Sequence, residues 1–256
     1  MSKAARERSA RERLAVERQK QAARQKQIRL ISAVVGAVVA IAAVVAVVVV
    51  VLDQKSKRNQ VAEPYTGPQA PLTRESDGSI TMAKPGVAKP VLEIFEDFQC
   101  PACQQFEKTL GGDVKKLASE GKVKVVYRPF HLFGGQPDPL KTQSLRSAAA
   151  ALCVPAAQWL SYHDALYKFQ PVEGTKGFAI KDLVSWGEDV GVKDANFAKC
   201  VTDQQKVPEV TTMTDYALKT RKVESTPTLF LDGKEINDQQ KADLAGAIAV
   251  AAAADK

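Results

Sequence analysis

The sequence predicts an α/β fold for residues 79–256 and a membrane-spanning helix near the N-terminus. Two observations carry this prediction. The apolar, β-branched run Val91–Phe95 is followed by the helically spaced segment Cys100–Leu110 and then by the alternating segment Lys122–Arg128, which indicates strand, helix and strand in that order. Residues 30–52 carry no charge and consist almost wholly of Val, Ala, Ile and Leu, and a stretch of this length can cross a bilayer as a helix.

The N-terminal tail holds the net charge of the chain. Residues 1–29 contain ten Lys and Arg and three Glu, a net of +7, which equals the net charge of +7 of the complete sequence. The rest of the chain therefore carries no net formal charge. This argues against nucleic-acid binding by the folded part, because such domains carry a basic patch of their own. We expect residues 1–29 to form a solvated, partly helical cytoplasmic tail.

Residues 30–52 are expected to anchor the chain in membrane lipid. As a helix the segment is about 35 Å long, enough to span a bilayer with some tilt. No small-residue cleavage site of the kind that ends a secretory signal peptide follows it. Basic residues before the span outnumber those after it, which favours a cytoplasmic N-terminus. The sequence thus predicts a single-pass protein of the cell membrane with its remaining residues extracytoplasmic.

Residues 53–78 mix Lys, Gln, Pro, Gly, Ser and Asp without apolar periodicity, and we expect a linker there. The domain over 79–256 should begin with a short strand. Its strand–helix–strand unit implies a right-handed crossover and a parallel strand pair. The expected elements are a strand at Ile80–Met82, a helix stop at Gly111-Gly112, a short helix at Val114–Glu120, a helical insertion over about 139–220, a strand at Pro227–Leu231, a hairpin turn at Asp232-Gly233, a return strand at Lys234–Ile236 and a closing helix at Gln239–Ala254.

Cys100 and Cys103 form a Cys-x-x-Cys pair at the expected strand-to-helix junction. Cys100 would lie in the first turn of the helix, where backbone N–H groups and the helix dipole favour a thiolate, the reactive form of cysteine. Cys103 recurs with Phe106 and Leu110 at helical spacing and should share their buried face. The pair is therefore a candidate redox centre. A zinc site would need four ligands, and no second Cys-x-x-Cys unit is present, so no metal is predicted.

Cys153 and Cys200 complete an even count of four cysteines. Spacing alone leaves three connectivities open. Because an extracytoplasmic location favours oxidised cysteines, we expect these two to form a structural disulfide. It would close a loop of about 48 residues. A second redox pair is the alternative.

The motif from Asp97 to Cys103, with Ser225-Thr226-Pro227-Thr228 opening a late strand, resembles the thioredoxin fold of the DsbA-like bacterial extracytoplasmic thiol oxidoreductases. The resemblance covers about residues 79–256. It implies a mixed sheet flanked by helices, with a helical insertion. It also implies that Pro227 is a cis proline beside the cysteine pair, and that Thr226 offers backbone contacts to a bound peptide.

One position departs from the family pattern. Thioredoxin relatives often carry a buried acid six residues before the first cysteine, and Ile94 occupies that position here. Glu93 should point to the other face of the strand. Glu96, Asp97 or solvent would then have to accept the proton of the second cysteine. Ala102 stands where a histidine would help to stabilise the thiolate.

The resemblance implies a membrane-anchored thiol:disulfide oxidoreductase that forms disulfides in secreted or cell-surface proteins. It needs no cofactor, and a membrane thiol oxidase would reoxidise it. Two alternatives remain open. An extracytoplasmic reductase or isomerase, for example in cytochrome c maturation, would use the same residues, because the direction depends on reduction potential. A non-catalytic binding module with this fold is the other alternative.

Overall fold

The computed structural model describes residues 60–254, and residues 61–256 make up one compact unit. This unit begins earlier than the sequence predicts. Ala62 and Ala70 are buried, and β1 (Leu72–Arg74) pairs antiparallel with β2 (Ile80–Met82). The linker predicted over 53–78 therefore includes a part of the fold. A three-residue strand is too short to produce a pattern in the sequence, and its pairing with β2 is what makes it a strand.

The central sheet is mixed, as the resemblance implies. Within the described residues it has six strands in the order β1-β2-β4-β3-β5-β6. β3 pairs parallel with β4 and antiparallel with β5, while β2 pairs antiparallel with β4. The other strands are β3 (Val91–Glu96), β4 (Lys124–Pro129), β5 (Thr228–Leu231) and β6 (Lys234–Glu235). Asp232 and Gly233 both have positive φ, at 46° and 80°, which fits the predicted two-residue hairpin turn between β5 and β6.

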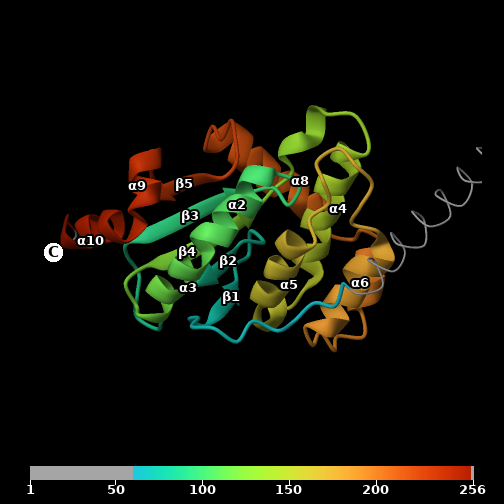
Figure 1. Cartoon of the computed structure of the whole chain (residues 1–256), viewed down its shortest axis with the longest axis horizontal. Coiled ribbons are helices and arrows are strands. Elements are labelled where there is room, and N and C mark those ends of the chain that lie inside the picture. Colours follow the sequence, from blue (N-terminus) through green and yellow to red (C-terminus); the bar gives the residue numbers. More distant parts are fainter. Residues whose placement is uncertain (1–59, 255–256) are drawn as a thin grey trace, which may run out of the picture. The chain divides into compact units, whose positions relative to one another are not determined.

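The insertion between β4 and β5 is helical throughout its regular parts, as predicted. The helices of the described chain are α2 (Pro101–Thr109), α3 (Gly111–Ser119), η1 (Leu132–Gly135), α4 (Leu140–Cys153), α5 (Ala156–Lys168), α6 (Ile180–Asp189), α7 (Phe197–Thr202), α8 (Val207–Asp215), η2 (Tyr216–Thr220), α9 (Asp238–Ala242) and α10 (Leu244–Ala254). Figure 1 shows α2 and α3 lying across β3 and β4.

Two boundaries were predicted wrongly. α2 ends just before Gly111-Gly112 as predicted, with Leu110 as its C-cap residue, but the second short helix, α3, begins at Gly111 and not at Val114. A Cβ atom at position 111 would collide with the carboxylate of Glu107, so glycine leaves room for that side chain. The closing helix breaks at Asp243 into α9 and α10, and a capping box formed by Asn237 and Gln240 begins α9.

Strand alternation divides the core into two faces. Leu92 and Ile94 of β3 pack in the larger hydrophobic cluster with α2, α3 and α5, whereas Phe95 packs on the opposite side with α4 and α8. Glu96 follows the parity of Leu92 and Ile94 and therefore faces α2. The end of β3 thus delivers the chain directly into the cysteine motif.

Nothing in the described range is suited to cross a bilayer: no helix among residues 60–254 is both long and apolar enough. The tail and the span predicted over 1–29 and 30–52 lie outside the described residues.

Candidate active site

Cys100 occupies the N-cap position of α2. Its backbone is extended, with φ −79° and ψ 118°, and Pro101 follows at the first helical position, where a missing N–H costs nothing. The N–H groups of the first turn have no partners within the helix and point toward the cap. Its side chain is buried, with 7% of its surface exposed. Cys100 therefore lies where the sequence predicts an electropositive helix end.

Cys103 lies one turn further along α2 and is fully buried. Both cysteines are free thiols in this structure. Hydrogen bonding by Cys103, together with Thr226 and backbone N–H groups of the first turn, outweighs burial and lowers the pKa of Cys100 to about 6. Burial, the contact with Cys100 and the charge of Glu96 raise the pKa of Cys103 well above its ordinary value. The pKa values of the two thiols are therefore shifted in opposite directions, so that Cys100 favours the thiolate and Cys103 the thiol.

The loop before β5 brings Thr226 and Pro227 to the cysteine pair. The Thr226–Pro227 peptide bond is cis, as the resemblance implies. The Cys100 thiol donates to the carbonyl oxygen of Thr226 over 3.3 Å. Thr226 itself is buried. Segments 126 residues apart in the chain therefore meet at one sulfur atom.

Asp97 and Gln170 hold in place the loop between β3 and α2, which leads to Cys100. The buried carboxylate of Asp97 accepts hydrogen bonds from the backbone N–H groups of Gln99 (2.8 Å) and Leu132 (2.9 Å). Burial raises the pKa of Asp97 to about 6. From the far side, the amide of Gln170 donates to the carbonyl oxygens of Phe98 (2.8 Å) and Cys100 (3.0 Å). The helical insertion therefore holds the loop in place.

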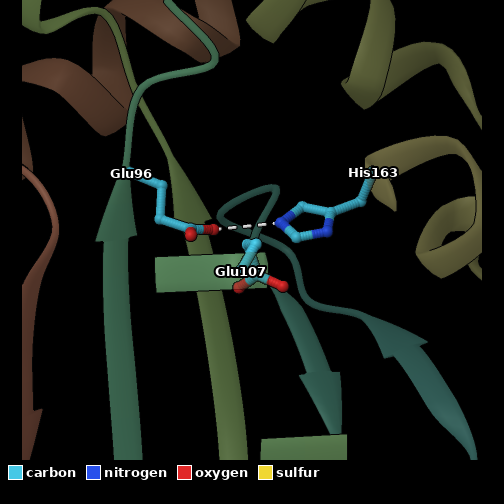
Figure 2. Close-up of side chains that lie close together, drawn as sticks. All are labelled: Glu96, Glu107 and His163. Carbon is cyan, nitrogen blue, oxygen red and sulfur yellow. Dashed lines mark hydrogen bonds and ion pairs between the residues drawn. The ribbon is translucent and has the colours of Figure 1, made fainter. Parts of the chain in front are cut away.

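A buried acid does lie near Cys103, although Ile94 occupies the expected position. Glu96 is fully buried and faces the fully buried His163 of α5, with 3.0 Å between Oε2 and Nε2 (Figure 2). Glu107 of α2 lies in the same cluster. Glu96 is one of the three proton acceptors that the sequence leaves open, whereas neither His163 nor Glu107 is predicted from the sequence as a site residue.

The side chain of Glu93 confirms the predicted strand parity. It points to the opposite face from Ile94 and pairs with Arg128 (2.8 Å) and Arg221 (2.9 Å). The same parity could have selected Glu96 from the sequence. Because Glu96 is two residues beyond Ile94, it lies on the Ile94 face and one step closer to the cysteines.

Comparison with known proteins shows the family to which this fold belongs. A family model described as thioredoxin matches residues 84–249. The chain belongs to the thioredoxin family. No curated protein sequence matches it. Among solved structures, this thioredoxin-family chain is 28% identical to the disulfide bond oxidoreductase DsbG from Mycobacterium tuberculosis, covering 77% of this chain and 92% of that one with a TM-score of 0.58.

Two further structures share the fold of this thioredoxin-family chain. DsbA from Mycobacterium tuberculosis is 28% identical, with 71% of this chain and 92% of that chain covered and a TM-score of 0.57. MdbA, a thiol-disulfide oxidoreductase from Corynebacterium matruchotii, is 24% identical, with 74% and 95% covered and a TM-score of 0.59. The DsbA-like resemblance is therefore confirmed at the level of family and fold.

The thioredoxin-family domain also contains the pairing predicted for the remaining cysteines. Cys153, the last residue of α4, is joined to Cys200 of α7 with an S–S distance of 2.06 Å. Cys200 is buried. The disulfide thus links two helices of the insertion.

One group in residues 60–254 has the composition of a metal site. Glu96, Glu107 and His163 each present a donor atom, and these atoms lie within 4.8 Å of one another. Carboxylate and imidazole are ligands that zinc accepts. The same three groups can also exchange protons, because each has a protonated and an unprotonated form.

Proposed function

We propose that the chain is a membrane-anchored, extracytoplasmic thiol:disulfide oxidoreductase that forms disulfides in secreted or cell-surface proteins. The observation that carries this proposal is the contrast within the cysteine pair. A Cys100 pKa of about 6 makes this sulfur a thiolate at neutral pH, whereas the Cys103 pKa lies well above its ordinary value. A stabilised thiolate is a good leaving group and favours the reduced enzyme, which drives oxidation of the substrate.

The reaction proceeds by two exchanges at Cys100. A substrate thiolate attacks Sγ of Cys100 in the Cys100–Cys103 disulfide, the S–S bond breaks, and Cys103 leaves as a thiolate that takes up a proton. A second substrate thiolate then attacks the substrate sulfur of the mixed disulfide and displaces Cys100 as a thiolate. The substrate is oxidised by two electrons, and the enzyme ends as a dithiol.

Substrate peptides would bind beside Thr226 and Pro227. The carbonyl oxygen of Thr226 already lies 3.3 Å from the Cys100 sulfur, so an extended peptide whose cysteine reacts there passes close to this backbone. Main-chain hydrogen bonds to a strand or loop edge bind peptides without regard to side chain. Such binding suits an enzyme that acts on many secreted proteins.

The predicted span over 30–52 would hold the domain at the extracytoplasmic surface of the cell membrane. There it would lie close to a membrane thiol oxidase that reoxidises Cys100 and Cys103. The disulfide between Cys153 and Cys200 supports an extracytoplasmic location, because structural disulfides persist outside the cytoplasm. A tail of ten basic residues within 1–29 would remain in the cytoplasm.

The test is to trap substrates on the full-length chain. In Cys103→Ala the mixed disulfide at Cys100 cannot be resolved internally, so substrates accumulate and can be identified by mass spectrometry. We expect secreted proteins with paired cysteines. The reduction potential decides the direction: a value near that of DsbA, about −120 mV, supports the oxidase, and a value near that of thioredoxin, about −270 mV, supports the reductase. A Cys100→Ala chain that still oxidised a reduced test protein would exclude this site.

A further inference from the structure

The side chains of Glu96, Glu107 and His163 meet in the interior of the domain. Figure 2 shows them converging from β3, α2 and α5. Each presents one possible ligand atom, and these atoms lie within 4.8 Å of one another. Ligand atoms around a tetrahedral zinc ion are about 3.4 Å apart. Small rotations of the three side chains would therefore allow all of them to contact a single ion.

Three carboxylate oxygens of this cluster are buried and have no hydrogen-bond partner within residues 60–254. They are Oε1 of Glu96 and both side-chain oxygens of Glu107. The side chain of Glu96 is fully buried, and only its Oε2 has a partner, Nε2 of His163 at 3.0 Å. Leaving buried acceptors unpaired is costly. A cation bound between the three side chains would satisfy all of these oxygens at once.

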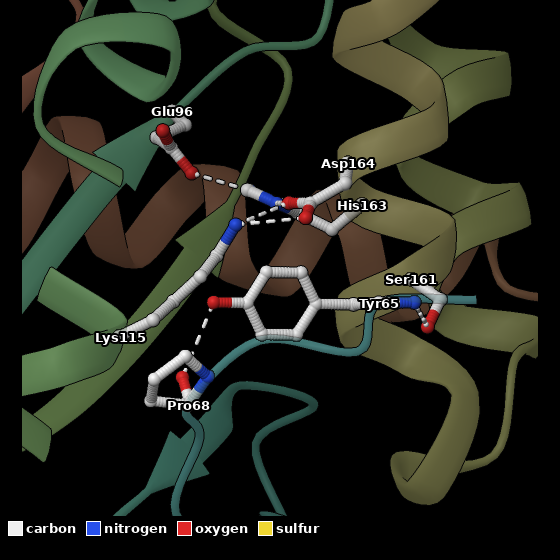
Figure 3. A network of polar contacts seen from close by, with 7 residues as sticks. All are labelled: Tyr65, Pro68, Glu96, Lys115, Ser161, His163 and Asp164. Carbon is white, nitrogen blue, oxygen red and sulfur yellow. Dashed lines mark hydrogen bonds and ion pairs between the residues drawn. The ribbon is translucent and has the colours of Figure 1, made fainter. Parts of the chain in front are cut away.

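The imidazole of His163 has the surroundings of a zinc-binding histidine. Its Nδ1 lies 3.3 Å from Oδ1 of Asp164, and the carboxylate of Asp164 pairs in turn with Lys115 at 2.7 Å (Figure 3). A histidine that binds zinc through one ring nitrogen commonly donates the N–H of the other to a carboxylate. A hydrogen bond from Nδ1 to Asp164 leaves Nε2, the atom that faces Glu96, as the ligand.

The composition of the cluster favours a transition-metal ion. Zinc accepts both carboxylate oxygen and imidazole nitrogen, whereas magnesium and calcium are bound through oxygen ligands. An imidazole among the three ligands therefore argues for zinc. The carboxylates also exceed the positive charge nearby, because Lys115 is already paired with Asp164 at 2.7 Å. A dication would balance the charges of Glu96 and Glu107.

A pocket connects the cluster with solvent. It has a volume of about 280 Å³ between α2, α3 and α5, and Glu107, Asp164 and Tyr167 are among its lining residues. The buried hydroxyl groups of Tyr127 and Tyr167 make no hydrogen bond within residues 60–254, and their rings lie 5.1 and 5.0 Å from the ring of His163. The pocket thus offers an entry path for an ion, and the hydroxyl groups can hold water beside it.

We propose that Glu96, Glu107 and His163 bind one Zn²⁺ ion, with a water molecule from the pocket as the fourth ligand. Neither Cys100 nor Cys103 is a ligand of this site. The ion ties α2 and α5 to the end of β3, the strand that leads into the cysteine motif. The proposal goes beyond the proposed function and does not depend on it, because zinc binding here involves no exchange of disulfides.

The test measures zinc binding to the full-length chain in detergent. The chain is oxidised first, so that Cys100 and Cys103 are joined and cannot bind metal as thiolates. It is then freed of metal with a chelator, incubated with Zn²⁺ and separated from unbound ion, and the metal is counted by elemental mass spectrometry. We expect one zinc ion per chain and a higher unfolding temperature with zinc than without it. An oxidised chain that binds no zinc would overturn the proposal.

The two histidines of the chain provide a matched pair of variants. His163→Gln should abolish stoichiometric zinc binding and the rise in unfolding temperature. His131→Gln is the control, because Nδ1 of His131 contacts Ser144 at 2.8 Å, outside the cluster, and it should bind zinc as the wild type does. Asp164→Asn should weaken binding about 10- to 100-fold, since it alters the partner that orients His163. Stoichiometric binding by His163→Gln would exclude this site.

X-ray absorption by the zinc-loaded wild-type chain identifies the ligands without requiring any variant to fold. We expect nitrogen and oxygen neighbours at about 2.0–2.1 Å from the zinc and no sulfur at about 2.3 Å. The same spectrum is expected for the variant Cys100→Ser with Cys103→Ser, which should still bind one zinc ion. A sulfur neighbour, or loss of zinc from this double variant, would assign the metal to the cysteine pair and overturn the proposal.

Discussion

The Cys100 sulfur lies 3.3 Å from the carbonyl oxygen of Thr226, the residue before the cis proline. This contact joins the reactive sulfur to the backbone that is proposed to bind peptides. In the proposed function, a substrate cysteine approaches Cys100 along the 225–227 loop.

The Cys100 thiolate should be visible by ultraviolet absorbance. In the reduced chain we expect a titration midpoint near pH 6 for Cys100. The largest cause is the hydrogen bond from Cys103, so Cys103→Ala should move the midpoint upward, toward the ordinary value of 9.0. Cys103→Ser keeps a donor and should move it less. An unchanged midpoint in Cys103→Ala would assign the shift to the helix N-terminus instead.

The same shift should appear as a pH-dependent difference in stability between the two redox forms. The folded-state pKa of Cys100 is depressed from 9.0 to about 6. Its contribution to the reduced form is therefore complete above about pH 9 and is lost as pH falls through 6. About three pH units correspond to about 4 kcal/mol. Denaturant unfolding of the reduced chain, compared with the oxidised chain from pH 5 to about pH 9, measures it.

If the reduced form gains no stability relative to the oxidised form over that interval, Cys100 is not a stabilised thiolate. The oxidised chain is the appropriate reference because Cys100 does not titrate there, whereas most other groups titrate in both forms.

The sequence predicted correctly those features that depend on residues close together in the chain. The parity of β3, the buried side of α2 and the position of Cys100 all follow from periodic patterns within about ten residues. β1 was missed because Leu72–Arg74 becomes a strand only through its partner β2. The start of α3 was predicted too late, at Val114, because glycine favours helix ends in general, whereas Gly111 begins α3 and leaves room for the Glu107 carboxylate.

The residues that lie near Cys103 also differ in how far the sequence could predict them. Glu96 could have been chosen from strand parity, since it shares a face with Ile94. His163 could not, because its position depends on how α5 of the insertion docks against β3, 67 residues away in sequence. The pocket lined by Asp164 and Lys115 likewise requires three helices to be placed together.

Glu93 should contribute strongly to stability. Its carboxylate is 13% exposed and bridges Arg128 and Arg221, which are 13% and 19% exposed. We expect Glu93→Gln to lower the free energy of unfolding by about 2–4 kcal/mol, because two largely buried guanidinium groups each lose a carboxylate contact and Arg128 keeps only its pair with Asp77. Chemical denaturation measures the change.

The matched control for Glu93→Gln is the exposed pair between Glu63 and Lys168, whose side chains are 79% and 51% exposed at a separation of 3.5 Å. Solvent screens such a pair, so Glu63→Gln should change stability by less than about 0.5 kcal/mol. Equal effects of the two substitutions would mean that burial does not decide the strength of the Glu93 contacts.

The Cys153–Cys200 disulfide should stabilise the fold without taking part in exchange. It closes a loop with a sequence separation of 47 residues. Replacing both cysteines by alanine should therefore lower the free energy of unfolding by about 2–4 kcal/mol, while formation of a mixed disulfide at Cys100 keeps its rate. The complementary variant, Cys100→Ser with Cys103→Ser, should oxidise no reduced peptide. Residual oxidation by this variant would make the second pair a redox centre, because no other cysteines remain in the chain.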